Sequence, residues 1–202
     1  MRHVCFVRTV PQTGYKAVES SLTVLGNSES RVSSNGAHLS ASDRKFLGEA
    51  KGWLQRKSYG EAQCELDKIS PAGRVHTDVL LASLELQSGL KNHPRTVEAG
   101  RLLVEGRRCL DRAWVWLTLA DSLHQLGHTE EAYEKLKEFA RHGSRDGLVH
   151  YRLAVYACLL GKPDEAKRHF SSAMNTPEGA KLKLAALEDE QLQDIWDFLC
   201  QP

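Results

Sequence analysis

The fold is decided by two stretches, WLTLADSLHQLGHTEEA at residues 116–132 and HYRLAVYACLLGKPDEA at residues 150–166, which match at a fixed offset of 34 residues. The matching positions are Leu119, Ala120, Leu126, Gly127, Glu131 and Ala132 in the first copy and Leu153, Ala154, Leu160, Gly161, Glu165 and Ala166 in the second. Most residues between them differ, so what repeats is a set of packing and turn positions. A period of this length predicts tandem helical hairpins.

The first copy shows how one hairpin is encoded. Its apolar residues fall at helical spacing and form a single face, namely Trp116, Leu119, Ala120, Leu123 and Leu126. Gly127 is predicted to end this helix in the left-handed conformation, which glycine reaches without a clash. Thr129 then opens a second helix, whose first turn carries Glu130 and Glu131 near its positive end. The small residues Ala120 and Ala132 let the paired helices approach closely where they cross.

These positions resemble the motif of the tetratricopeptide repeat family, in which bulky residues, glycine, alanine, phenylalanine and proline recur at fixed offsets. The matches are Trp116, Leu119, Ala120, Leu123, Gly127, Ala132 and Leu136 in one copy and Leu153, Ala154, Gly161, Ala166, Phe170 and Ala173 in the next. His150 and Ala157 depart from the motif, because bulky residues are usual there, and Pro177 comes one place early. The resemblance implies an all-α, right-handed superhelical array of about four hairpins with a C-terminal capping helix.

Under this resemblance the array covers residues 41–178, with hairpins at about 43–72, 75–108, 113–142 and 147–176. In the first hairpin Lys57 and Ser58 stand where the turn glycine is expected, so the helix end is predicted to be less well capped. In the second, the link from Gly89 to Pro94 is predicted to be three to five residues too long. The register of its first helix stays ambiguous.

The two ends of the chain differ from the array. Residues 179–202 are predicted to form a capping helix with a polar outer side and an acidic tail, and Leu182, Leu184 and Leu187 supply the apolar side of the cap. The segment LEDEQLQDIW at residues 187–196 resembles the acidic tail of small bacterial tetratricopeptide proteins, which favours a complete array.

The serine-rich residues 1–40 show little periodicity and predict a flexible or disordered leader. The chain has only two methionines, Met1 and Met174, so a second interpretation places the native start at Val32 or Leu39. Residues 1–31 would then not belong to the native protein.

Composition narrows the class of partner. Lys and Arg (27) nearly balance Asp and Glu (26), so no strong basic field indicates nucleic acid or an anionic membrane. The five cysteines are scattered and form no CxxC pair, which is typical of reduced, packed thiols. No signal peptide and no apolar run of membrane-spanning length are found. We therefore expect a cytoplasmic protein.

The sequence contains none of the catalytic signatures GxGxxG, GxxxxGK[ST], HExxH or GxSxG, so we expect neither an enzyme nor a cofactor. His124 and His128 have the spacing of metal ligands on one helical face. However, Gly127 lies between them at the predicted helix end, and no third ligand is near in sequence. We therefore expect no metal site.

The resemblance implies that the first helices of the repeats line a concave groove for a partner. The groove and clamp positions carried over to this chain are Arg44, Lys51, Gln55, Trp114, Asp121, His124, Gln125, Tyr151 and Arg152. Lys51 and Arg152 match two elements of the clamp with which some family members hold a peptide carboxylate, but the asparagine is missing, so no chaperone-tail clamp is predicted. Trp114 is expected either to anchor a peptide or to pack against the second hairpin. Tyr151 is expected to contact the C-terminal cap.

The leading hypothesis is a non-enzymatic adaptor that binds an unknown protein or peptide in this groove. The alternative is a structural module that assembles with itself into a homo-oligomer. It would use the apolar part of the groove or the stripe formed by Leu192, Ile195, Trp196 and Leu199.

Overall fold

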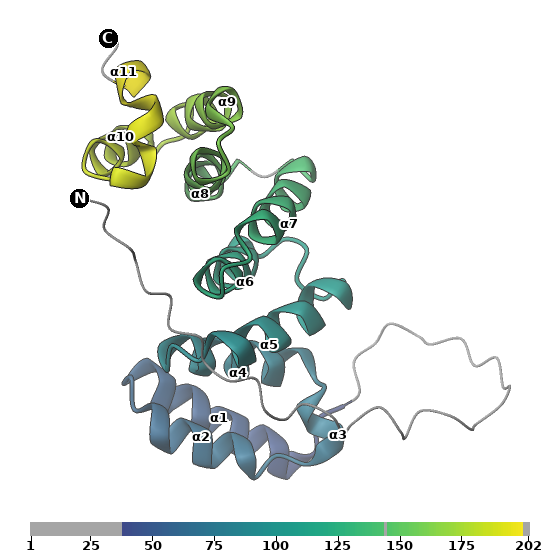
Figure 1. The fold of residues 1–202 in the computed structure, drawn as a ribbon. Coiled ribbons are helices and arrows are strands. Elements are labelled where there is room, and N and C mark those ends of the chain that lie inside the picture. The colour runs from purple at the N-terminus through teal and green to yellow at the C-terminus, as the bar shows by residue number, and fades with distance from the viewer. Residues whose placement is uncertain (1–37, 144, 200–202) are drawn as a thin grey trace, which may run out of the picture. The chain divides into compact units, whose positions relative to one another are not determined.

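The computed structural model describes residues 38–143 and 145–199 (Figure 1). Within these ranges every regular element is a helix, which confirms the all-α prediction. The predicted leader lies almost wholly in residues 1–37, outside the described ranges. Among the described residues, no helix combines the length and the apolar composition needed to cross a membrane.

Consecutive helices pack as hairpins. The pairs are α1 (Ala41–Gln55) with α2 (Tyr59–Asp67), α4 (Thr77–Gly89) with α5 (His93–Glu105), α6 (Ala113–Gln125) with α7 (Thr129–Arg141), and α8 (Gly147–Leu159) with α9 (Pro163–Met174). The short α3 (Pro71–Arg74) follows the first pair. After the last pair come α10 (Gly179–Leu187), the 3₁₀ helix η1 (Glu190–Ile195) and α11 (Trp196–Leu199).

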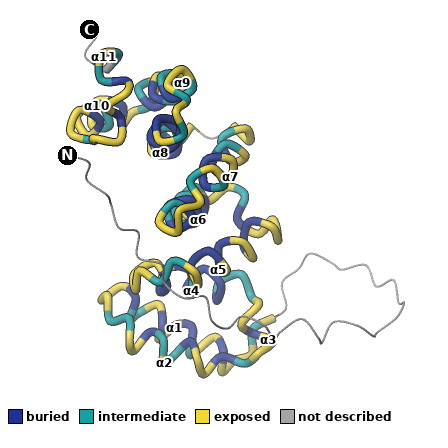
Figure 2. The backbone as a smooth tube through the Cα atoms, in the orientation of Figure 1, coloured by how far each residue is buried: buried dark blue, intermediate teal, exposed yellow. Residues whose placement is uncertain are grey.

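Each hairpin packs on the next in the same way. The second helix of a pair contacts the first helix of the following pair, as in α2 with α4, α5 with α6 and α7 with α8. The first helices also contact one another in order, α1 with α4, α4 with α6 and α6 with α8. Figure 2 shows the buried residues of neighbouring helices facing each other along this succession.

The hairpin turns have one length. They cover residues 56–58, 90–92, 126–128 and 160–162, and the middle residue of each has a positive φ: Lys57 (58°), Lys91 (55°), Gly127 (86°) and Gly161 (68°). The prediction for Gly127 is therefore confirmed, and Lys57 takes the conformation of the glycine that it replaces. A lysine there bears the steric strain of its Cβ, which glycine avoids.

The predicted long link in the second hairpin is wrong, because Gly89 and Pro94 belong to helices. Gly89 ends α4, where a Cβ would collide with the ring of Tyr59. Pro94 lies in the first turn of α5, a position that proline suits because its missing N–H has no partner there. Asn92 caps α5 by accepting a hydrogen bond from the Arg95 backbone N–H at 3.4 Å.

Aligned on these turns, three of the four hairpins carry a pair of alanines at equivalent positions. Ala50 and Ala62, Ala120 and Ala132, and Ala154 and Ala166 are the pairs, and each of these alanines is fully buried. In the second hairpin the equivalent residues are Leu84 and Thr96, also fully buried. The Thr96 hydroxyl donates to the backbone carbonyl of Asn92 at 2.9 Å, which satisfies its polar group inside the core.

Two details of the predicted apolar faces are wrong. Leu126 is 40% exposed because α6 ends at Gln125, so the helical stripe stops one residue earlier. In the cap, Leu184 and Leu187 are 68% and 42% exposed, so the outer side of α10 is apolar. Leu182 of α10 packs against the core, as predicted, where α10 contacts α8 and α9. The 3₁₀ helix adds to this cover, since Leu192 and Ile195 are buried where η1 contacts the same two helices.

Trp116 is the largest fully buried side chain. Its ring lies 5.4 Å from that of Phe139, and its Nε1 donates to the Cys109 carbonyl at 3.2 Å. We expect Trp116→Ala to lower the free energy of unfolding by about 3–5 kcal/mol, because it leaves a large cavity. Denaturant unfolding measures this, with Trp114→Ala as the matched control, since Trp114 is 42% exposed and its loss should cost less than half as much. If both variants lost the same free energy of unfolding, Trp116 would not be more deeply buried than Trp114.

The strained lysines give a stabilising substitution. We expect Lys91→Gly to raise the free energy of unfolding by about 0.5–1 kcal/mol, because the left-handed conformation costs glycine nothing. The control is Lys45→Gly in the exposed middle of α1, which should destabilise by about 1 kcal/mol through the low helix propensity of glycine. If Lys91→Gly lowered the free energy of unfolding as much as Lys45→Gly, Lys91 would not have the left-handed conformation.

Candidate functional site

The first helices α1, α4, α6 and α8 carry the residues of the predicted site, and we call their shared surface the first-helix face. Two rows of equivalent positions follow these helices, Arg44, Asp78, Trp114 and Leu148 in one and Lys51, Glu85, Asp121 and Val155 in the other. All but the fully buried Val155 reach the surface. The rows change in character along the array. Charged residues occupy α1 and α4, whereas apolar residues occupy α8.

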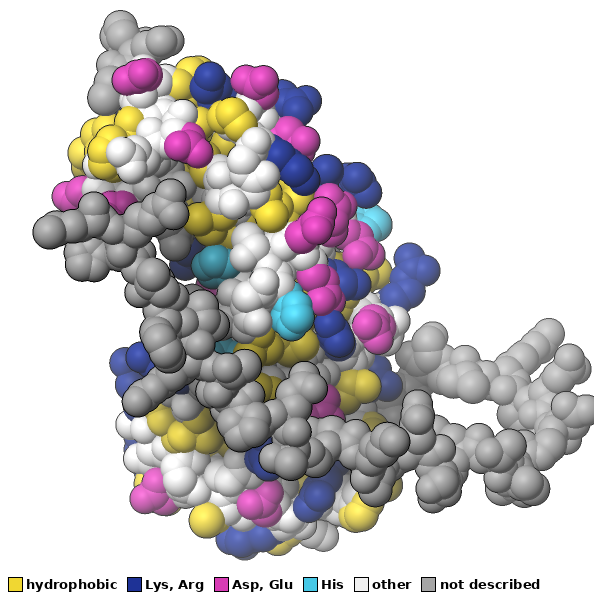
Figure 3. Space-filling model, viewed as in Figure 1, with side chains coloured by type: hydrophobic (Ala, Val, Ile, Leu, Met, Phe, Trp, Pro, Cys, Tyr) yellow, Lys and Arg dark blue, Asp and Glu magenta, His cyan; other side chains and the backbone are white. Residues whose placement is uncertain are grey.

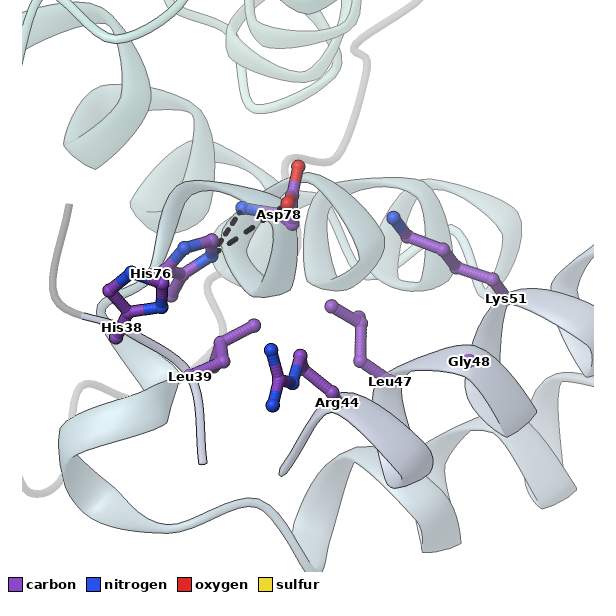
Figure 4. Close-up of a pocket in the computed structure, with 8 residues that line it drawn as sticks. All are labelled: His38, Leu39, Arg44, Leu47, Gly48, Lys51, His76 and Asp78. Carbon is purple, nitrogen blue, oxygen red and sulfur yellow. Dashed lines mark hydrogen bonds and ion pairs between the residues drawn. The ribbon is translucent and has the colours of Figure 1, made fainter. Parts of the chain in front are cut away.

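The N-terminal part of the face is hollowed into an open pocket of about 380 Å³ (Figure 4). The lining residues are His38, Leu39, Arg44, Leu47, Gly48, Lys51, His76 and Asp78. Arg44 and Lys51 are exposed and lie two helical turns apart on one side of α1. Neither makes an ion pair with another described residue. The pocket therefore combines two available cations with the apolar side chains of Leu39 and Leu47.

The opposite wall of this pocket is the start of α4. His76 caps that helix, since its Nδ1 accepts from the Asp78 backbone N–H at 3.2 Å and lies 3.9 Å from the Asp78 carboxylate. Figure 4 marks both interactions. The Asp78 carboxylate thus has a neighbour at the start of its own helix, while Arg44 and Lys51 line the pocket from α1.

Trp114 and Leu148 are the apolar residues of the same row. They are 42% and 45% exposed, although Trp116, two residues along α6, is fully buried. The Trp114 side chain is therefore only partly covered by the rest of the chain. The exposed parts of both side chains are available to a partner.

Asp121 joins α6 to α8 through a polar network. The Tyr156 hydroxyl donates to Asp121 Oδ1 at 2.6 Å, and Arg152 Nε lies 3.4 Å from the same oxygen. Burial of Tyr156, with the negative charge of Asp121 and the hydrogen bond to it, raises the pKa of the phenol well above its usual value. His124 lies against the Tyr156 ring, with centroids 5.3 Å apart, and its Nδ1 is 2.9 Å from the Thr129 hydroxyl. Asp121 is thus engaged with Arg152 and Tyr156, whereas His124 contacts Tyr156 and Thr129.

Tyr151 is 7% exposed and contacts the C-terminal segment, as expected. Its hydroxyl donates to Asp189 Oδ2 at 2.7 Å, and the other oxygen of Asp189 caps η1 by accepting from the Gln191 N–H at 3.0 Å. This residue holds the cap in place. Gln55 and Gln125 are exposed at the last positions of α1 and α6.

A second polar cluster, between α7 and α9, was not predicted. Tyr133 is fully buried, its hydroxyl donates to Glu165 and lies 3.2 Å from His169 Nε2. The hydrogen bond from Tyr133 lowers the pKa of Glu165. Burial, together with the neighbouring His150, lowers the pKa of His169 to about 4.

A signal for this cluster was present in the repeat. Glu131 and Glu165 occupy the same position in the two copies, and each bonds to the second helix of the preceding hairpin. Glu131 pairs with Arg101 at 2.6 Å, and Glu165 accepts from Tyr133. The recurring glutamate therefore ties neighbouring hairpins together.

Within residues 38–143 and 145–199, no group of three or more His, Cys, Asp or Glu side chains is placed to hold a metal ion. Cys64, Cys109 and Cys158 are free thiols. Comparison of the chain with protein-family models, curated proteins and solved structures finds no significant match.

The lowered pKa of His169 makes stability depend on pH. In the unfolded chain the imidazole titrates near its ordinary pKa of 6.5, whereas in the folded protein it titrates at about 4. The unfolded state therefore binds more protons between these values, so stability is complete above pH 6.5 and falls as pH decreases. Because the ring is partly solvated, we expect a loss of about 1–2 kcal/mol between pH 7 and pH 4.5.

His169→Gln should remove this part of the pH dependence. The exposed His142→Gln serves as the matched control, and urea unfolding at pH 7, 6, 5 and 4.5 provides the measurement. Acidification also removes the contribution of Glu165 to stability. This occurs at lower pH, because the hydrogen bond from Tyr133 lowers the pKa of Glu165 below 4.5 in the folded protein. If the free energy of unfolding changed equally with pH in the wild type and in His169→Gln above pH 5, His169 would not be a buried neutral histidine.

Proposed function

We propose that the chain is a tetratricopeptide-like adaptor without catalytic activity, which acts in the cytoplasm and binds an extended segment of another protein across the first-helix face. The spacing of the turns supports the family resemblance. The left-handed turn residues at positions 57, 91, 127 and 161 are 34, 36 and 34 residues apart. Such a regular period is typical of stacked helical hairpins, whose right-handed superhelical arrangement is part of the proposal.

One observation carries the binding proposal, namely the exposure of Trp114 and Leu148 at equivalent positions of adjacent hairpins. A tryptophan loses little side-chain entropy on binding and presents a large apolar area, which makes it a frequent anchor at interfaces. Two such residues on neighbouring first helices fit a ligand that crosses the helices and places apolar side chains against both.

The charged groups of the first-helix face indicate which end of the ligand lies over α1. Asp121 and Arg152 are engaged with each other and with Tyr156, whereas Arg44 and Lys51 make no ion pair with described residues. An acidic residue of the ligand would therefore lie over α1, and apolar residues would lie over α6 and α8. The interspersed Asp78 and Glu85 make the face unsuited to a nucleic-acid backbone, which needs a continuous positive surface.

Selection of peptides from a random display library on the full chain tests this function. We expect the selected peptides to be rich in aromatic or leucine residues, with acids at one end, and to bind the Trp114→Ala, Leu148→Ala double variant at least about tenfold more weakly. Isothermal titration calorimetry gives both dissociation constants.

The control variant is Leu102→Ala, which removes an apolar side chain that is 51% exposed on α5 and so lies outside the first-helix face. It should bind the selected peptides like the wild type. Binding that the double variant retains in full would refute the first-helix face as the site.

A further inference from the structure

The helix α1 and its turn form a basic end. Arg44, Lys51, Arg56 and Lys57 are exposed, and none of them makes an ion pair with another described residue. The two acids of α1 are already occupied. Asp43 is buried and accepts hydrogen bonds from the backbone and hydroxyl of Ser70 at 2.9 and 2.8 Å. Glu49 lies 3.9 Å from Lys45.

The other end of the described chain is acidic. Glu188, Glu190, Asp194 and Asp197 are exposed and make no ion pair with described residues. Next to them, Leu184 and Leu187 expose 68% and 42% of their surface on α10. Figure 3 shows apolar side chains gathered over this helix. We call these six residues the acidic end.

One molecule does not pair its own two ends. The basic end lies on α1, which packs on α2 and α4, whereas α10 and η1 pack on α8, α9 and α11. Four unpaired cations and four unpaired carboxylates thus occur on separate surfaces of one chain. Opposite charges on separate surfaces attract between molecules, and they orient the encounter.

We propose that the acidic end of one copy docks on the basic end of another, so that the chain associates head to tail. The four carboxylates that follow α10 meet Arg44 and Lys51, and the leucines of α10 lie against the apolar part of the pocket formed by Leu39 and Leu47. The contact buries the apolar outer side of α10, which the described fold leaves in solvent. Peptide binding at Trp114 and Leu148 is not required for this association.

The geometry of such a contact has two measurable consequences. A head-to-tail contact is heterologous, so the copies form an open chain, or a ring where the rotation between them closes. In an open chain each added copy leaves one free end of each kind. Exposed charges are screened over about 8–10 Å at 0.1–0.15 M salt, so association weakens as salt is added.

Sedimentation equilibrium of the full chain tests the proposal. We expect the weight-average mass to rise continuously with concentration at 50 mM salt and to fall to that of the monomer at 0.5 M. The reversals Arg44→Glu, Lys51→Glu in one variant and Glu188→Lys, Glu190→Lys in another should each weaken self-association at least about tenfold, because like charges then face each other. An equimolar mixture of the two variants should associate again, since each then offers the other a complementary end.

A variant with Glu98→Lys and Arg141→Glu, which reverses exposed charges on α5 and α7, should behave like the wild type. Circular dichroism confirms that all variants are folded. A monomeric wild type at all concentrations would overturn the proposal. So would reversed-charge variants that associate singly as strongly as the wild type, or variants that gain nothing when mixed.

Discussion

Each hairpin is closed by a turn of three residues, and the left-handed middle residue of that turn determines how the two helices meet. The turn brings the second helix back so that a residue twelve positions after the small residue of the first helix lies at the crossing. Ala50 and Ala62, and later Ala120 and Ala132, then allow close contact. Because this geometry is repeated, successive first helices pack in order and present equivalent positions on one face. The turn keeps this conformation even at Lys57 and Lys91, where a side chain makes it strained.

Hydrogen bonds and ion pairs between hairpins engage many of the polar side chains of the array. Glu131 with Arg101, Glu165 with Tyr133 and Asp121 with Tyr156 each connect neighbouring hairpins, and Tyr151 connects the last hairpin to the tail through Asp189. Groups engaged in this way lose their partners if a ligand takes them, and a buried polar group without a partner is costly. The first hairpin has no such tie through Arg44 or Lys51. The available charge is therefore concentrated at one end of the first-helix face.

The sequence predicted the helices best where one face of a helix is apolar and the other polar. In α6 and α7 the buried residues follow the helical period, and Gly127 marks the turn. In α4 and α8 the buried residues surround the helix, because α4 lies between two hairpins and α8 is covered by α7, α9 and η1. A helix that is apolar all round has no period to detect, which is why the register of the second hairpin stayed ambiguous. The pairing of Asp121 with Arg152 was hidden for a different reason, since it joins residues on separate helices whose packing the sequence does not specify.

The helix α4 also explains how the two ends of the array are connected. Its Val79, Ala82 and Leu86 belong to the core shared with α1 and α2, whereas Leu80, Leu81 and Leu84 belong to the larger core that continues to the C-terminal segment. The two clusters of buried residues meet through this one helix, so the first hairpin is held by a smaller apolar core than the rest. Regions with a smaller core open at lower free energy than the whole domain. A ligand or a second copy that contacts both α1 and α4 binds only the closed arrangement, and it therefore stabilises the first hairpin by mass action. The proposed binding at the basic end would thus be thermodynamically linked to the local stability of that end.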